Sequence, residues 1–122
     1  MTINEALGRI DALRPNKYAK EEKIAWLSHL DGMILAQLIN NYEDGDDIYF
    51  YGYDGDTDGE TELIVPSPWD NLYILWLESQ IDYANSDYEH YNNSVKMYND
   101  AYEAYSRHYH RTHMPRTVRM KY

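Results

Sequence analysis

Two short motifs in the sequence carry side chain types that bind metal ions. The first, Asp54-x-Asp56-x-Asp58-Gly59, matches the opening of a calcium loop, in which alternate carboxylates face a hard cation and glycine makes the sharp turn. The match fails further on, because Val65 stands where the bidentate glutamate belongs and no helix is expected before the loop. We interpret the three aspartates as a solvated turn, with a cation site as the alternative.

The second motif, His108-x-His110-x-x-His113, offers nitrogen ligands for a transition metal. His110 and His113 can share a helical face, but His108 and His110 diverge on a helix. No carboxylate lies nearby in the sequence to complete a ligand set. We therefore interpret these histidines as polar residues of a basic tail, and expect neither a metal ion nor another cofactor.

Catalytic motifs are missing from the rest of the chain. The sequence has no cysteine, no Gly-x-Ser-x-Gly motif, no glycine-rich phosphate loop and no His-Glu-x-x-His motif. The lack of cysteine excludes a disulfide framework, a thiolate zinc site and a thiol nucleophile. We expect a protein that is not an enzyme. A hydrolase would need a cleft that gathers distant polar residues, which a sequence does not display.

The charge is distributed unevenly along the 122 residues, which we expect to form a single helical domain, 1–122. The net charge is −10, which argues against a simple nucleic-acid binder. Residues 43–62 hold nine acids and no base, whereas residues 107–122 hold five bases and no acid. No apolar run approaches the roughly 20 residues of a membrane span, so no membrane association is expected. The chain thus combines an acidic segment, 43–65, with a basic tail, 107–122.

The first forty residues predict two helices. Thr2-x-x-Glu5 is a capping box that opens a helix over about 3–13, and Arg14-Pro15 ends it. A second helix begins near Ala19 and ends around Asn40–Tyr42. Its apolar stripe consists of Ile24, Leu27, Leu30 or Asp31, Ile34 and Leu38. Gly32 inside it costs about 1 kcal/mol of helix stability relative to alanine. A close crossing with another segment would explain a glycine at this position.

The next segment, 48–65, is typical of a short β-hairpin. Residues 48–53 and 61–65 are rich in strand-forming side chains and flank an acidic tip. Because a lone hairpin is marginal in water, it must pack against the helices or against a neighbouring subunit.

The second half of the chain predicts one long helix or two antiparallel ones. Ser67 is the expected cap, with Pro68 at the first helical position. A continuous helix over 68–112 would keep one heptad stripe in phase. A break near Asn85 would use Ser86-x-x-Glu89 as a new capping box. The stripe consists of Ile74, Leu77, Ile81, Ala84, Tyr88, Tyr91, Val95, Tyr98, Tyr102, Tyr105 and Tyr109. Both alternatives stay open.

Tyrosine dominates this stripe, since the chain has fourteen Tyr, three Trp and a single Phe. We interpret the stripe as core and subunit interface together, because a buried tyrosine ring keeps a hydroxyl for a wet edge. A stacking platform for single-stranded nucleic acid is disfavoured, since residues 63–106 hold only one base. The expected interface residues are Tyr88, Tyr91, Tyr98, Tyr102, Tyr105, Tyr109, Arg111, Arg116, Arg119 and Lys121.

These elements together predict a mainly α fold. We expect a small helical bundle with a long C-terminal helix or helical hairpin, plus one short β-hairpin near 48–65. The order is a short capped helix ending near Ile10-Asp11, an apolar helix through Ile24–Ile39, a polar hairpin, and a helix from Val65-Pro66-Ser67-Pro68-Trp69 to Tyr83. This order resembles the head–tail connector, or head-completion adaptor, family of tailed bacteriophages and prophages. The stretch from Glu62 to Pro115 also resembles uncharacterised prophage proteins of the same morphogenesis region.

The resemblance implies a structural virion protein, assembled in the host cytoplasm, that forms a ring between portal and tail and extends the DNA channel. Its implied partners are further copies of itself and the phage portal and tail proteins, with passive contact to channel DNA. A ring needs heterologous contacts, which the acidic hairpin and basic tail can supply. The alternative is an acidic protein that mimics DNA and blocks a nucleic-acid enzyme, for which the nine-acid run is the motivating feature.

Overall fold

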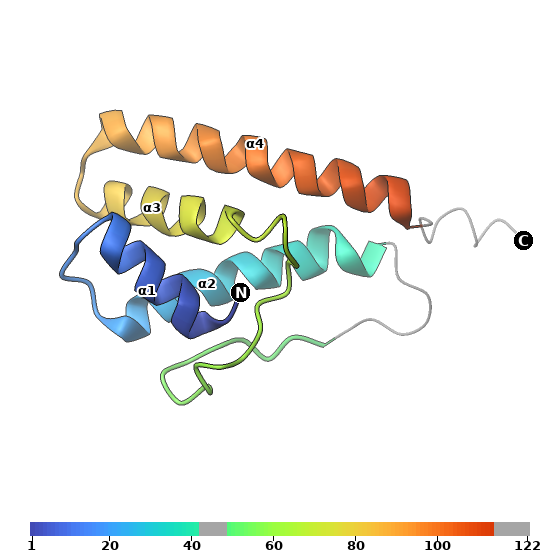
Figure 1. The fold of residues 1–122 in the computed structure, drawn as a ribbon, viewed down its shortest axis with the longest axis horizontal. Coiled ribbons are helices and arrows are strands. Elements are labelled where there is room, and N and C mark those ends of the chain that lie inside the picture. Colours follow the sequence, from blue (N-terminus) through green and yellow to red (C-terminus); the bar gives the residue numbers. More distant parts are fainter. Residues whose placement is uncertain (42–48, 114–122) are drawn as a thin grey trace, which may run out of the picture.

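The computed structural model describes residues 1–41 and 49–113, which form a small bundle of α-helices (Figure 1). The elements are α1 (Ile3–Leu13), α2 (Lys20–Gln37), a short 3-10 helix (Ile39–Asn41), α3 (Leu72–Ala84) and α4 (Tyr88–Thr112). The predicted fold class, a mainly α bundle ending in a helical hairpin, is confirmed.

The central element of the bundle is α3. It packs along α4 on one side and against α1 and α2 on the other (Figure 1). Its mostly apolar sequence suits this position, because a helix covered on several sides needs apolar residues all round. Most of the fully buried core side chains come from α1, α2 and α3, and Val65, which precedes α3, is fully buried as well. Those of the helices include Ile10, Ile24, Leu27, Ile34, Leu77 and Ile81.

The first helix has the bounds and the cap that the sequence predicts. The Glu5 N–H donates to the Thr2 hydroxyl oxygen at 3.1 Å, and the Thr2 N–H donates to the Glu5 carboxylate at 3.2 Å. These reciprocal bonds satisfy two amides that the first turn leaves unpaired. The helix ends before Arg14-Pro15, as proline requires.

The second helix is shorter than the sequence predicts. It ends at Gln37, because Leu38 has φ −124° and ψ −64° and the chain tightens there into the 3-10 turn. Tyr42, the outer limit of the predicted helix, lies outside the described residues. The predicted stripe is buried, and it includes both Leu30 and Asp31. The neighbour of Gly32 is the Phe50 ring, which lies 3.6 Å from where a Cβ would be.

The structure decides between one long helix and two. The chain turns back after Ala84, so α3 and α4 lie antiparallel (Figure 1). The predicted capping box at Ser86 and Glu89 is wrong. Ser86 has φ +57°, in the left-handed region, whereas an N-cap residue is extended. The cap is Asp87, whose carboxylate accepts from the His90 N–H at 3.3 Å.

Removal of this cap is the first test of the hairpin. We expect Asp87→Ala to lower the melting temperature by a few degrees, because the first turn of α4 loses its acceptor. The matched control is Glu89→Ala, which leaves the cap in place and should change the melting temperature less. Thermal unfolding followed by circular dichroism measures both. An equal effect of the two substitutions would contradict the assignment of Asp87 as the cap.

The third helix starts later than predicted, so the prediction of Ser67 as cap and Pro68 as first residue is wrong. The segment before Leu72 forms tight turns, in which the Trp69 N–H donates to the Pro66 carbonyl at 2.9 Å. The Asp70 carboxylate accepts from the Met1 amino group at 3.4 Å. These turns place Trp69 against α4 rather than inside a helix.

The predicted β-hairpin is not present in residues 49–65, which we call the strap. The strap crosses the α1 and α2 side of the bundle, away from α4 (Figure 1). Its only β-type pairing in the described chain is a single bridge from Glu62 to Thr2. The two expected strands do not pair because Tyr53 bonds to α2 and Leu63 bonds to the N-terminal residues. The predicted hairpin begins at Ile48, which lies outside the described residues.

Candidate functional site

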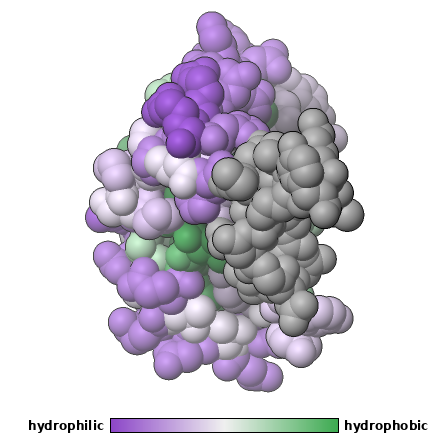
Figure 2. Space-filling view, turned by 90° about the vertical axis from the view of Figure 1, so that its right-hand side faces the viewer, coloured by the Kyte–Doolittle hydropathy of each residue, from purple (hydrophilic) through white to green (hydrophobic). Residues whose placement is uncertain are grey.

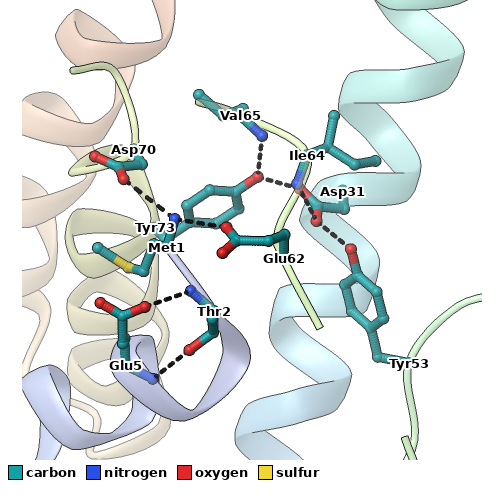
Figure 3. A network of polar contacts seen from close by, with 10 residues as sticks. All are labelled: Met1, Thr2, Glu5, Asp31, Tyr53, Glu62, Ile64, Val65, Asp70 and Tyr73. Carbon is teal, nitrogen blue, oxygen red and sulfur yellow. Dashed lines mark hydrogen bonds and ion pairs between the residues drawn. The ribbon is translucent and has the colours of Figure 1, made fainter. Parts of the chain in front are cut away.

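A buried carboxylate holds the strap against the helices (Figure 3). Asp31 lies in the middle of α2 and is completely buried. Its Oδ1 accepts a hydrogen bond of 2.5 Å from the Tyr73 hydroxyl on α3, and its Oδ2 accepts one of 2.6 Å from the Tyr53 hydroxyl in the strap. The Ile64 N–H donates to Oδ2 at 3.2 Å, and the Val65 N–H donates to the Tyr73 oxygen at 2.7 Å. One carboxylate therefore ties two parts of the strap to α2 and α3.

Asp31 has no cationic partner among the described residues. Burial raises the pKa of Asp31 above its ordinary value, although the hydrogen bonds from Tyr53, Tyr73 and Ile64 act in the opposite direction. Burial, together with the Asp31 charge, raises the pKa of both tyrosines far above the ordinary value, so both stay protonated donors. The sequence signal for this network is an aspartate at a core position of an apolar stripe.

The far end of the strap is fixed to the start of the chain. The Leu63 N–H donates to the Met1 carbonyl at 2.9 Å, and the Asn4 N–H donates to the Gly59 carbonyl at 2.9 Å. A Cβ on Gly59 would lie 2.2 Å from the Asn4 Oδ1, so the exposed Asn4 side chain would have to move to admit a larger residue. The Met1 amino group pairs with Glu62 at 3.2 Å (Figure 3). These contacts replace the hairpin partner that the sequence suggested.

The aspartates of the calcium-like motif hold a turn. The Asp54 carboxylate accepts from the Asp56 N–H at 2.9 Å, and the Asp58 carboxylate accepts from the Glu60 N–H at 3.0 Å. Such bonds from an aspartate to the amide two residues on are turn-forming. In residues 1–41 and 49–113, no three acidic or histidine side chains are grouped so that they could hold a metal ion. The interpretation as a solvated turn fits this geometry.

The tyrosines predicted as an interface lie at different depths on α4. Tyr98, Tyr105 and Tyr109 are buried within the chain's own bundle, and Tyr98 packs against Trp76 of α3 with ring centroids 5.1 Å apart. Tyr91 and Tyr102 are half-buried, and Tyr88 is exposed. The predicted stripe is thus largely intramolecular core, and its two exposed members, Ala84 and Tyr88, lie at the α3–α4 turn.

Two exposed tyrosine pairs lie far apart in the sequence. Tyr49 and Tyr51 in the strap are 75% and 90% exposed, with ring centroids 4.5 Å apart. Tyr83 and Tyr88 flank the α3–α4 turn, are 58% and 56% exposed, and lie 6.0 Å apart. The sequence analysis missed three of these four as surface residues, because neither spacing nor composition distinguishes an exposed tyrosine from a buried one.

The basic residues in the described part of the tail lie at the end of α4. Arg107 and Arg111 are exposed and four residues apart, so they share one helical face. His108 stacks on Trp69 at 5.0 Å, and His113 stacks on Tyr109 at 3.7 Å, so these two histidines pack on aromatic rings. The predicted interface residues Arg116, Arg119 and Lys121 lie outside the described residues.

A second buried carboxylate joins three helices. Asp82 on α3 is buried and pairs through Oδ1 with the guanidinium of Arg14, which follows α1. Its Oδ2 accepts a hydrogen bond of 2.9 Å from the Ser94 hydroxyl on α4. Sequence analysis did not find this contact, because a single aspartate beside an apolar position has no distinctive pattern.

A groove of about 420 Å³ lies between α2 and the strap. Its α2 wall includes His29 and Met33, and its strap wall includes Phe50 and Tyr51. The His29 ring also stacks on Trp76 at 6.3 Å. The groove is therefore shaped partly by the strap and is lined mainly by aromatic and aliphatic groups.

Comparisons of the chain with protein-family models, with curated proteins and with solved structures found no match. No helix within residues 1–41 and 49–113 is both long and apolar enough to cross a lipid bilayer.

Proposed function

We propose that this protein is a structural component of a tailed-phage or prophage virion, an adaptor that forms a ring between the portal and the tail. The observation that carries the proposal is the presence of two exposed tyrosine pairs on different parts of one small bundle. An adaptor must contact two different neighbours, and tyrosine is enriched in protein interfaces because its ring buries area while its hydroxyl stays hydrogen-bonded.

The positions of the two pairs support an adaptor. The Tyr49–Tyr51 pair lies in the strap, which crosses the α1 and α2 side of the bundle, whereas the Tyr83–Tyr88 pair lies at the α3–α4 turn. In the structure the strap is held on the bundle through Asp31, and the α3–α4 turn is held through Asp82. A segment that is held in place while it docks loses little conformational entropy, so the closed strap and the turn are suited to binding.

The charge distribution supports a ring. The strap carries five exposed acids between Asp54 and Glu62, and the end of α4 carries the exposed Arg107 and Arg111. The strap and α4 lie on opposite sides of the bundle, and Figure 2 shows hydrophilic residues over both its upper part, which contains α4, and its lower part, which contains the strap. The acidic strap and the basic end of α4 offer complementary charges for head-to-tail contacts between neighbouring copies, which form a ring when the rotation between copies closes.

Substitution of the tyrosine pairs tests this proposal. We expect Tyr49→Ala with Tyr51→Ala to weaken binding to one neck partner, and Tyr83→Ala with Tyr88→Ala to weaken binding to the other, each at least tenfold, as interface aromatics do. The partners are the portal and tail-completion proteins encoded with the chain, and surface plasmon resonance measures each affinity. The matched control is Met97→Ala, which removes an equally exposed side chain of α4 outside both pairs.

Two results of this experiment would contradict the proposal. One is that the unmodified chain binds neither the portal nor a tail protein. The other is that both tyrosine double variants bind as the Met97→Ala control does. Circular dichroism of each variant checks that the helices are retained.

A DNA-mimicking inhibitor is the second candidate, and the five exposed acids between Asp54 and Glu62 favour it. Regularly spaced carboxylates can imitate phosphates for a basic DNA-binding groove. Competition of the chain against duplex DNA for a restriction nuclease separates the two candidates. Displacement of DNA at low micromolar chain concentration would favour the mimic, and the adaptor predicts none.

A further inference from the structure

The strap has no regular secondary structure, so its position depends on a few defined contacts. Its inner side is apolar: Leu63 and Val65 are buried, and Phe50 packs over Gly32 of α2. Its rear half, from Gly59 on, is paired with the start of the chain. Its front half, before Gly59, makes no backbone ladder with the residues that the structure describes, and the Tyr53 N–H donates to the Ser28 hydroxyl oxygen at 2.9 Å. Side-chain bonds therefore decide whether the front half stays in place.

The two halves of the strap meet at Asp31. Tyr53 reaches the carboxylate from the front half, and the Ile64 N–H reaches the same oxygen from the rear half. Tyr73 completes the group from α3, and it also accepts from the Val65 N–H. Loss of the carboxylate would remove an acceptor from both halves at once. Asp31 therefore acts as a latch that holds both halves of the strap to the helices.

The groups that face Asp31 come from every element packed around it. They are the Tyr53 hydroxyl and the Ile64 N–H of the strap and the Tyr73 hydroxyl of α3. The amino group of Met1, drawn in the same view, pairs with Glu62 and Asp70 (Figure 3). All three groups that bond to the carboxylate are neutral. Its negative charge is therefore balanced by dipoles alone.

We propose that Asp31 is a pH-dependent latch, and that the strap opens and closes as a unit on a folded helical bundle. Closing removes the carboxylate from water, so the closed state holds a proton on Asp31 more tightly than the open state does. The strap closes most firmly at low pH, and the open fraction grows as pH rises through the pKa that Asp31 has in the closed state. Opening also removes the wall that Phe50 and Tyr51 give to the groove. The inference rests on the Asp31 contacts and does not depend on the proposed function.

Amide hydrogen exchange measured by NMR between pH 4 and 8 tests the latch. The reporters are the N–H groups of Tyr53, Ile64 and Val65, which donate to the side chains of Ser28, Asp31 and Tyr73 respectively. After correction for intrinsic exchange rates, we expect their protection factors to fall with pH, by up to tenfold per pH unit, the limit for one titrating group. Amides of α2 and α4 should keep their protection over the same range.

The isosteric variant Asp31→Asn removes the titration while it keeps a side chain of the same shape. We expect the protection of the three reporters to become independent of pH in this variant. The proposal is overturned if the pH dependence persists in Asp31→Asn, or if the reporters show none in the unmodified chain. It is equally overturned if the strap and the helices lose protection together, because the strap would then be an inseparable part of the bundle.

A milder variant decides the matter if Asp31→Asn does not fold. Tyr53→Phe removes one donor at a half-buried position, and we expect about tenfold lower protection in the front half of the strap with unchanged helices. The matched control is Tyr18→Phe, which removes a hydroxyl that donates to Asn85 at 2.6 Å, away from the strap. Equal strap protection in Tyr53→Phe and Tyr18→Phe would refute the latch.

Discussion

Replacement of Arg14 by methionine is expected to lower the free energy of unfolding by about 3 kcal/mol. Asp82 is buried between α1, α3 and α4, and Arg14 is its only cationic partner in the described chain. Methionine keeps much of the volume of the arginine stem but leaves the carboxylate charge without compensation, with the Ser94 hydroxyl as the remaining donor. Urea unfolding followed by far-UV circular dichroism measures the change.

The double variant Arg14→Met with Asp82→Leu is the control for this result. It removes the buried charge together with its partner, and we expect it to recover at least half of the lost stability, since apolar replacements of a buried pair are often close to neutral. A loss below about 1 kcal/mol in Arg14→Met alone would mean that the pair behaves as an exposed salt bridge. That outcome would contradict its role in joining the three helices.

Replacement of Tyr73 by phenylalanine is expected to lower the free energy of unfolding by about 2–3 kcal/mol, the second large effect that we expect. The substitution removes the bond to Asp31 Oδ1 and leaves the Val65 N–H without its acceptor, both in a buried place. Both partners are buried, so each lost hydrogen bond leaves an unsatisfied polar group and adds to the loss. Urea unfolding at pH 7 provides the measurement.

The matched control for Tyr73→Phe is Tyr98→Phe. Tyr98 is also buried, but its hydroxyl makes no hydrogen bond with the described residues. We expect this substitution to cost less than about 1 kcal/mol. A similar loss of unfolding free energy in the two variants would indicate that tyrosine hydroxyls contribute equally throughout the core. It would contradict a particular contribution of the Asp31 network.

Local signals in the sequence predict the parts of the fold that local physics determines. The capping box at Thr2 and the proline after Arg14 fix α1, because both act within one turn of the chain. The apolar stripe of α2 predicts its buried face, including Asp31. The hairpin of α3 and α4 stayed undecided, because a heptad stripe keeps its phase in either arrangement and only the left-handed Ser86 shows the turn.

The contacts of the strap could not be predicted from local signals in the sequence. Its strand-forming residues are compatible with a hairpin, but each half finds its partner elsewhere, Tyr53 at Asp31 and Leu63 at Met1. These contacts join residues that are 22 and 62 positions apart, and nothing in the local pattern encodes them. The candidate site could not be predicted from the local pattern either. Only burial within the bundle distinguishes the buried Tyr98 and Tyr105 from the exposed Tyr83 and Tyr88.

Native mass spectrometry of the chain mixed with rings of the portal protein that the proposal requires as its partner tests the proposed adaptor most directly. The proposal predicts a species in which several copies of the chain are added to one portal ring, and it predicts fewer added copies as salt concentration rises, because charged contacts between copies are screened. The chain alone can be a monomer under this account. Separate masses of portal ring and chain at low salt, with no joint species, would contradict it.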